Sequence, residues 1–183
     1  MDSDVTVAFL GLGSNLGDRA GNLLLAVRSL LEASFVVDKL SAIYETEPVG
    51  IDTDKMFLNM VAEIHVQQVS ASQMMARLLR IEYLLGRGDK TVKKPRTVDL
   101  DILFFGDQVV ETEFLTVPHP RLAMRKFVLC PLNEIAPNFV HPVSGIEVCD
   151  LLKDCEDMSE VKRWDPNEGL FPQTPQNGGL GTA

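Results

Sequence analysis

The sequence lacks the features that would assign it to a secreted, membrane-spanning or metal-finger class. Its three cysteines, Cys130, Cys149 and Cys155, are odd in number and fit no CxxC spacing, which argues against a disulfide framework or a cysteine-rich zinc site. No apolar run approaches the roughly 20 residues that span a bilayer. The N-terminal MDSDVTV has no basic segment followed by an apolar one, as a signal peptide would. We therefore expect reduced thiols and a cytoplasmic location.

Positive charge is also scarce. The chain carries 17 Lys and Arg against 26 Asp and Glu, a formal net charge of −9. A general nucleic-acid binder normally has a basic surface, so any anionic ligand must be met by a local group of basic side chains. The 183 residues, 45% of them hydrophobic, indicate one globular domain with a substantial core.

The periodicity of apolar residues predicts strands over 5–12, 36–44, 57–66 and in the run that ends at 105, and helices over 18–33 and 71–85. Asn15 or Asp18 and Ser70 or Ser72 are candidate N-caps, and Gly86 ends the second helix. A turn at 106–107, a returning arm at 108–110, a short helical or irregular segment within 115–137 and a helix near 148–152 follow. This order predicts an α+β, ferredoxin-like βαββαβ core, with an antiparallel sheet, helices on one face and ligand loops on the other.

The most informative stretch is PRTVDLDILFF, residues 95–105. Side chains alternate along a strand, so Asp99 and Asp101 share one face, with Cα atoms roughly 6.5–7 Å apart. Two carboxylates that close repel each other unless a cation lies beside them, and their oxygens suit Mg²⁺, for which phosphates supply further ligands. The alternative is a solvated acidic pair. Arg96 favours the metal–triphosphate interpretation, because an Arg and an acid-bound metal act on the same anion.

A glycine-rich loop, GLGSNLGDR at 11–19, lies between the first strand and the first helix. Its glycines resemble a dinucleotide fingerprint, with Asp38 about where a ribose-binding acid is expected. The spacing, however, is GxGxxxG, and a long irregular segment follows the second strand. A tight strand-to-helix turn is therefore favoured over a dinucleotide site.

Together these pieces closely resemble the 6-hydroxymethyl-7,8-dihydropterin pyrophosphokinase family of folate biosynthesis. The motifs that carry the resemblance are GLGSNLGDR, YETEPVG at 44–50, FLN at 57–59, PRTVDLDILFFG at 95–106 and TVPHPRLAMRKFVLCPLNEIAP at 116–137. The resemblance covers about residues 5–164. It implies a pyrophosphokinase domain at 1–164, and the Pro-, Gly-, Gln- and Asn-rich stretch at 165–183 is expected to be a disordered C-terminal tail.

The resemblance implies that pyrophosphate moves from ATP to the pterin hydroxymethyl oxygen and leaves AMP. It implies two Mg²⁺ ions on Asp99 and Asp101, with Arg87 and Arg96 as catalytic cations. The residues implied to contact ATP are Glu82, Arg87, Arg96, Ile102, Thr116, His119 and Arg125. Those implied to contact the pterin are Thr46, Val49, Phe57, Asn59 and Phe127, with the two phenylalanines on either side of the ring. The expected partners are these small molecules, with no nucleic acid and no membrane, and the oligomeric state is left open.

The chain departs from the family pattern at two places. Lys90 stands near the position of a second loop arginine, and Pro120 follows His119 where an aromatic hydroxyl is common. A hypothesis from another class is a non-catalytic ferredoxin-like module that binds a pterin or nucleotide as a regulatory signal. Such a module would not need Asp99, Asp101 and Arg96 together.

Overall fold

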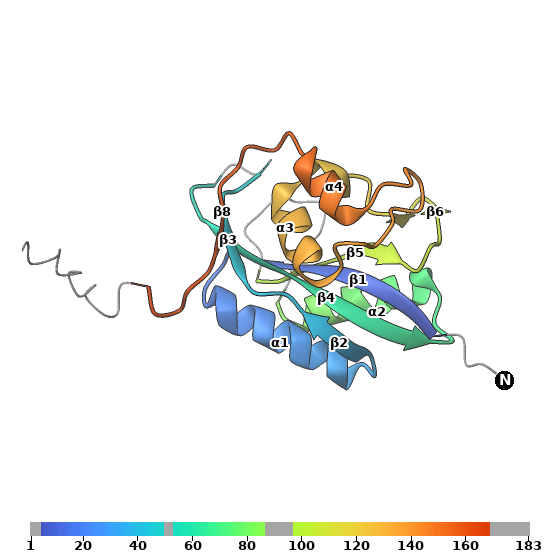
Figure 1. Ribbon diagram of the computed structural model, residues 1–183. Helices are drawn as coiled ribbons and strands as arrows, with labels where there is room; N and C mark the ends of the chain where they lie inside the picture. The colour runs from blue at the N-terminus through green and yellow to red at the C-terminus, as the bar shows by residue number, and fades with distance from the viewer. Residues whose placement is uncertain (1–4, 50–52, 87–96, 169–183) are drawn as a thin grey trace, which may run out of the picture.

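The computed structural model describes residues 5–49, 53–86 and 97–168 (Figure 1). The strands of its main sheet are β1 (Val5–Ser14), β2 (Val36–Leu40), β3 (Tyr44–Thr46), β4 (Phe57–Gln67), β5 (Asp99–Phe105) and β8 (Val161–Arg163). A small second sheet joins β6 (Val110–Glu111) to β7 (Thr116–Val117). The helical elements are α1 (Arg19–Glu32), α2 (Ala71–Leu84), the 3₁₀ turn η1 (Leu122–Met124), α3 (Lys126–Ile135) and α4 (Val148–Lys153).

The main sheet has the order β5-β1-β4-β3-β8, and β2 pairs with β4 beside β3. Strand β1 lies between β4 and β5, and all these pairs are antiparallel. Together with α1 and α2 this is the βαββαβ arrangement, so the fold class predicted from the sequence is confirmed.

Helices α1 and α2 cover one face of the sheet (Figure 1). Asp18 caps α1, since its side chain accepts a hydrogen bond from the Gly21 N–H at 3.0 Å. Ser70 and Gln73 form a reciprocal capping box at the start of α2. Alternate residues of the strands meet the apolar sides of these helices in one core, which includes Leu10, Leu12, Leu23, Leu30, Ile64, Met74, Leu78 and Leu100.

The sequence predicted only ligand loops on the opposite face of the sheet, but helices lie there as well. Helices α3 and α4 lie over it (Figure 1) and enclose a second core around Phe9, Val61 and Phe104. The segment 115–137, predicted to hold a short helical or irregular stretch, contains the ten-residue helix α3 in spite of Pro131. The buried residues Val128, Leu129 and Leu132 form an apolar stripe on the sheet side of α3, and burial of this stripe outweighs the hydrogen bond lost at the proline.

Two strand predictions need correction. The single strand expected over 36–44 is divided, because the Ser41 Oγ accepts from the Val61 N–H at 2.9 Å and the chain bulges before β3 resumes pairing with β4. The arm expected at 108–110 does not return along β5; β6 pairs instead with β7. Strand β8 was not predicted, because its three residues give no periodic signal.

Within the described ranges, no helix combines the length and the apolar character needed to cross a membrane.

Candidate active site

One row of paired residues crosses four strands at one end of the sheet. Asp99 on β5, Gly13 on β1, Asn59 on β4 and Tyr44 on β3 are successive Cα partners. Residues directly opposite in antiparallel strands point to the same face. The Asp99 carboxylate and the Asn59 amide therefore project from the same face, on either side of a residue without a side chain.

The next row repeats this arrangement. Asp101 on β5 pairs with Gly11 on β1, which pairs with Val61 on β4. The predicted alternation of Asp99 and Asp101 along one strand face is therefore present, and both residues are half-buried. Neighbouring side chains cover both glycines: Leu103 would lie 3.4 Å from a Cβ atom at Gly11, and Asn59 lies against Gly13.

Gly13 is required by its neighbour. A Cβ atom at this position would lie 2.8 Å from Asn59 Oδ1, closer than van der Waals contact allows. Gly11 and Gly13 belong to β1 and not to the turn that the sequence favoured. Gly17 alone of the three has a positive φ, +65°, as a tight turn before α1 requires.

The Asn59 amide is held in one orientation. Its Nδ2 donates to Thr46 Oγ1 at 2.7 Å, and the two residues are 8% and 1% exposed. This bond directs Oδ1 toward Gly13. Phe57, the β4 partner of Thr46, is half-buried at the start of β4. Val49 lies exposed in the segment that follows β3.

Arg125 brings positive charge to the two acids. Burial lowers the pKa of Arg125, and Arg121 lowers it further, while Asp101 and Asp99 act in the opposite direction. The guanidinium stays charged. It also lies 5.4 Å from the centre of the Phe127 ring, so one side chain connects the acidic strand with the first turn of α3.

His119 is fixed beside the same strand. Its backbone N–H donates to Leu103 O at 3.0 Å, and its Nδ1 accepts from the Arg121 N–H at 3.2 Å. Burial, with help from Arg125 and Arg121, lowers the pKa of His119 to about 4, against a smaller opposite effect of Asp99. The imidazole is therefore neutral at pH 7 and carries its proton on Nε2, where it can donate to an anion.

The other predicted site residues lie in different surroundings. Glu82 is 1% exposed, and its Oε1 accepts from the Leu100 N–H at 2.8 Å, which anchors β5 to α2. Ile102 is 3% exposed in the core beneath α1 and α2, so its side chain points away from the carboxylates. Thr116 is exposed on β7. Arg87, Lys90 and Arg96 lie outside the described residues.

Sequence reasoning missed one contact at the start of α1. Arg19 donates to the Met56 carbonyl at 2.9 Å and pairs with the Glu45 carboxylate at 2.8 Å. The start of α1 is thereby tied to β3 and to the residue before β4. Only its place in GLGSNLGDR marked Arg19 in the sequence.

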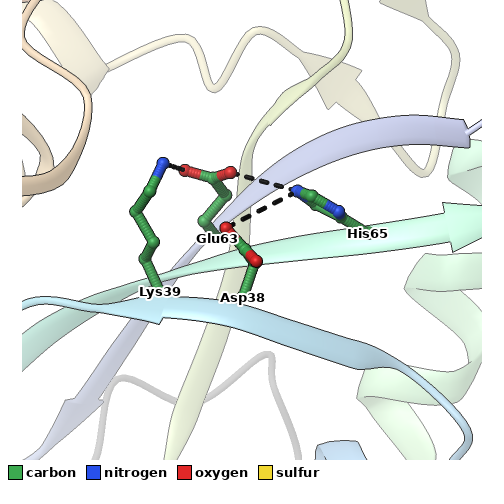
Figure 2. A network of polar contacts seen from close by, with 4 residues as sticks. All are labelled: Asp38, Lys39, Glu63 and His65. Carbon is green, nitrogen blue, oxygen red and sulfur yellow. Dashed lines mark hydrogen bonds and ion pairs between the residues drawn. The ribbon is translucent and has the colours of Figure 1, made fainter.

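A second polar cluster lies on the same sheet face, further along β4 (Figure 2). Lys39 Nζ lies 2.7 Å from Glu63 Oε2, His65 Nε2 lies 3.1 Å from Glu63 Oε1, and Asp38 Oδ2 lies 3.9 Å from the same His65 nitrogen. Burial would raise the pKa of Glu63, but its bonds to Lys39 and His65 outweigh burial and hold this pKa below 4.5. Three residues of kinds that can bind a metal, Asp38, Glu63 and His65, meet here. Lys39, however, already neutralises the buried Glu63 carboxylate. His65, predicted to be solvated, is half-buried in this network.

Asp38 belongs to this cluster and not to the end of the sheet that contains Gly13 and Asn59. Its neighbour His65 is six residues along β4 from Asn59, roughly 20 Å by strand rise. The dinucleotide interpretation, which needed Asp38 near the glycines, therefore loses its ribose-binding acid.

These features define an α+β protein of the ferredoxin-like type, which brings carboxylates, a buried amide and a partly buried arginine to one end of its sheet. The family model for 7,8-dihydro-6-hydroxymethylpterin-pyrophosphokinase matches residues 9–137. The chain belongs to this family, as its motifs indicated.

Two relatives are named 2-amino-4-hydroxy-6-hydroxymethyldihydropteridine pyrophosphokinase. The one from Bacillus subtilis is 39% identical over 165 residues, 90% of this chain and 93% of its own. The one from Aquifex aeolicus is 36% identical over 139 residues, 76% of this chain and 86% of its own.

Solved structures support the fold. The crystal structure of Plasmodium falciparum HPPK-DHPS with pteroate matches with a TM-score of 0.68 and 16% identity over 84% of this chain. The match spans only 45% of the Plasmodium chain. At this identity the likeness concerns the architecture alone.

Proposed function

We propose that this chain transfers a pyrophosphoryl group from ATP to the hydroxymethyl oxygen of 6-hydroxymethyl-7,8-dihydropterin, with AMP as the other product, as a step of folate biosynthesis. Family membership gives the reaction class. The observation that carries the assignment to this site is the row Asp99–Gly13–Asn59, which places an acid and a buried amide on the same face of the sheet, on either side of a glycine.

Asp99 and Asp101 are the residues that would hold magnesium. Their oxygens are the donors that Mg²⁺ prefers, and the ion usually completes its shell with water and phosphate oxygens. When bound, the metal would neutralise phosphate charge. Mg²⁺ as the metal, and two ions as its number, are part of this proposal.

Transfer of this kind needs in-line positioning and charge stabilisation more than covalent help from the protein. Arg125 supplies a permanent positive charge beside Asp99 and Asp101. His119, kept neutral, supplies an Nε2–H donor without a second mobile proton. We assign both to the triphosphate, together with Arg87 and Arg96 as the resemblance implies. Glu82, Ile102 and Thr116 are assigned to ATP on the same basis, the last two around the adenine. Arg87 and Arg96 keep the catalytic role expected from the sequence.

The pterin half of the site uses the amide and the aromatic rings. Asn59 Oδ1, directed by Thr46, accepts a hydrogen bond from an N–H at the polar edge of the ring. Phe57 and Phe127 would stack on the two faces of the ring, and Val49 would lie at its margin. Arg125, over the Phe127 ring, connects this half with the phosphate half.

The deciding experiment is incubation with ATP, Mg²⁺ and 6-hydroxymethyl-7,8-dihydropterin, followed by identification of the nucleotide product. AMP formed only when pterin is present supports the proposal. ADP would indicate an ordinary kinase. Neither nucleotide, with pterin bound, would favour the non-catalytic regulatory module.

We also propose residues 1–164 as the functional unit. The backbone N–H of Trp164 donates to Ile43 O at 2.9 Å, which fits a domain that ends there. The tail at 165–183 extends mostly outside the described residues, and the cytoplasmic location stays a prediction.

A further inference from the structure

Glu134, near the end of α3, joins three elements that are far apart in sequence. Its Oε2 accepts from the Ala42 N–H at 2.9 Å and from the Tyr44 hydroxyl at 3.0 Å. Its Oε1 lies 3.6 Å from the Arg163 guanidinium on β8. The carboxylate therefore connects α3, the start of β3 and the strand at the edge of the sheet, and no part of the proposed reaction uses it.

The position of Glu134 on α3 gives these contacts a meaning. Phe127 precedes Glu134 by seven residues, which is two helical turns, so the two side chains lie on the same face of α3. Helix α3 packs against β3, β4 and β8. The face that holds β3 through Glu134 is thus the face that carries Phe127 at its other end.

Strand β3 leads from the same contact to the amide of the site. Tyr44 is the direct partner of Asn59, and Thr46, two residues on, shares its face and binds the Asn59 amide at 2.7 Å. Burial raises the pKa of Tyr44, and the bond to Glu134 raises it further, so the phenol stays a donor at neutral pH. A shift of Tyr44 relative to α3 would therefore change the separation between Asn59 and Phe127.

We propose that Glu134 is a positioning residue. It sets the distance between two parts of the pterin pocket, the polar pair Thr46 and Asn59 and the ring of Phe127. This inference rests on the proposed function, since it concerns the same pocket. Glu134 itself touches no reacting group.

Two variants separate the hydrogen bonds from the charge. Glu134→Ala removes both acceptor contacts, whereas Glu134→Gln keeps one side-chain oxygen, and a single oxygen takes both bonds in this structure. We expect Glu134→Ala to raise KM for the pterin about tenfold, with kcat and KM for ATP within about twofold of the starting protein. Glu134→Gln should restore most of the pterin affinity, and Tyr44→Phe, which loses one bond, should give a smaller rise.

Glu32→Ala is the matched control. Glu32 also forms an ion pair, with Arg28 at 2.8 Å, but on exposed α1. It should leave all three kinetic constants unchanged. Pterin affinity, measured by calorimetry with a non-hydrolysable ATP analogue and Mg²⁺, should follow the KM values.

An unchanged pterin KM in Glu134→Ala, or equal losses in kcat and in both KM values, would overturn the positioning role. So would a folded Glu134→Gln variant that is as defective as Glu134→Ala, because charge and not spacing would then matter. A starting protein that binds pterin but forms no AMP would overturn the proposed function alone, and calorimetry of the Glu134 variants would still decide the inference.

Discussion

Two rows on the same face of the sheet both contain an acid, yet only one has the features of a site. The first row is Asp99–Gly13–Asn59–Tyr44, and the second is Phe104–Phe9–Glu63–Lys39. They lie four residues apart along β4, roughly 13 Å by strand rise. The second row has a phenylalanine where the first has Gly13, and its acid has a lysine ammonium 2.7 Å away.

The difference shows that the neighbours of the acids, and not acidity itself, distinguish the two ends. At the second row the Lys39 ammonium neutralises the Glu63 carboxylate (Figure 2). The Phe9 side chain, on the neighbouring strand β1, is buried. At the first row a glycine stands between the acid and the amide, and the Arg125 guanidinium lies near Asp99 and Asp101. A permanent positive charge at this place is suited to an anionic ligand.

The largest effect should come from the acids of the first end. Asp99→Ala or Asp101→Ala should lower kcat about a thousandfold or more, because several kcal/mol of metal-based charge stabilisation would be lost. The fold should persist, since both side chains are half-buried and outside the two cores. Steady-state AMP production and circular dichroism measure the two properties.

The matched control is Glu63→Gln, an acid on the same face at the other end. We expect its kcat to be unchanged and its thermal stability to fall, because Lys39 loses its partner. A large loss of activity in Glu63→Gln, or near-normal turnover in either aspartate variant, would remove the distinction between the two rows.

Two aromatic residues, Phe127 in the first turn of α3 and Phe139 just after this helix, offer a second contrast of intermediate size. Phe127→Ala should weaken pterin binding by about 1–3 kcal/mol, the range measured for stacking on flat bases. Phe139→Ala should leave pterin affinity unchanged and destabilise the fold, because Phe139 packs on Phe9 and Phe104 with ring centres 5.0 and 4.7 Å away. Calorimetry with pterin and thermal unfolding distinguish the two. Equal pterin affinity in both variants would take Phe127 out of the pocket.

The two ends should also respond differently to acid. His119 has a depressed pKa of about 4 in the folded state against an ordinary 6.5, so the unfolded chain takes up the proton first. Its contribution, on the order of 1–2 kcal/mol after allowance for solvent screening, is present above pH 6.5 and is lost as the pH falls toward 4. Glu63 has a lowered pKa, so its contribution is present above pH 4.5 and is lost only below it.

Denaturant unfolding at a series of pH values tests this order. His119→Gln should flatten the stability profile between pH 6.5 and 4, and Glu63→Gln should flatten it below about 4.5. A His119 variant with the unchanged profile would mean that this histidine titrates normally.

Sequence reasoning succeeded where the chemistry is local in the chain. Strand alternation predicted that Asp99 and Asp101 share a face, and the order of elements predicted the fold, because both depend on neighbouring residues. The contact of Glu134 with Ala42 could not be predicted in this way, since it joins residues 92 positions apart. The same holds for the division of the strand over 36–44, which depends on a hydrogen bond between Ser41 and Val61. The motifs marked Ile102 as a site residue, but its side chain lies on the opposite face of the sheet from the acids.

The smallest effect is expected outside both rows. Deletion of residues 165–183 should leave kcat and both KM values within about twofold of the full chain, because Asp165–Glu168 forms only an exposed turn after the Trp164–Ile43 bond. A deletion that begins at Val161 is the informative control. It removes β8, the outer partner of β3, and with it the Arg163 contact to Glu134. The pterin KM should then rise while the second row keeps Glu63 and Lys39 intact. If the shorter deletion alone had that effect, the tail would belong to the site.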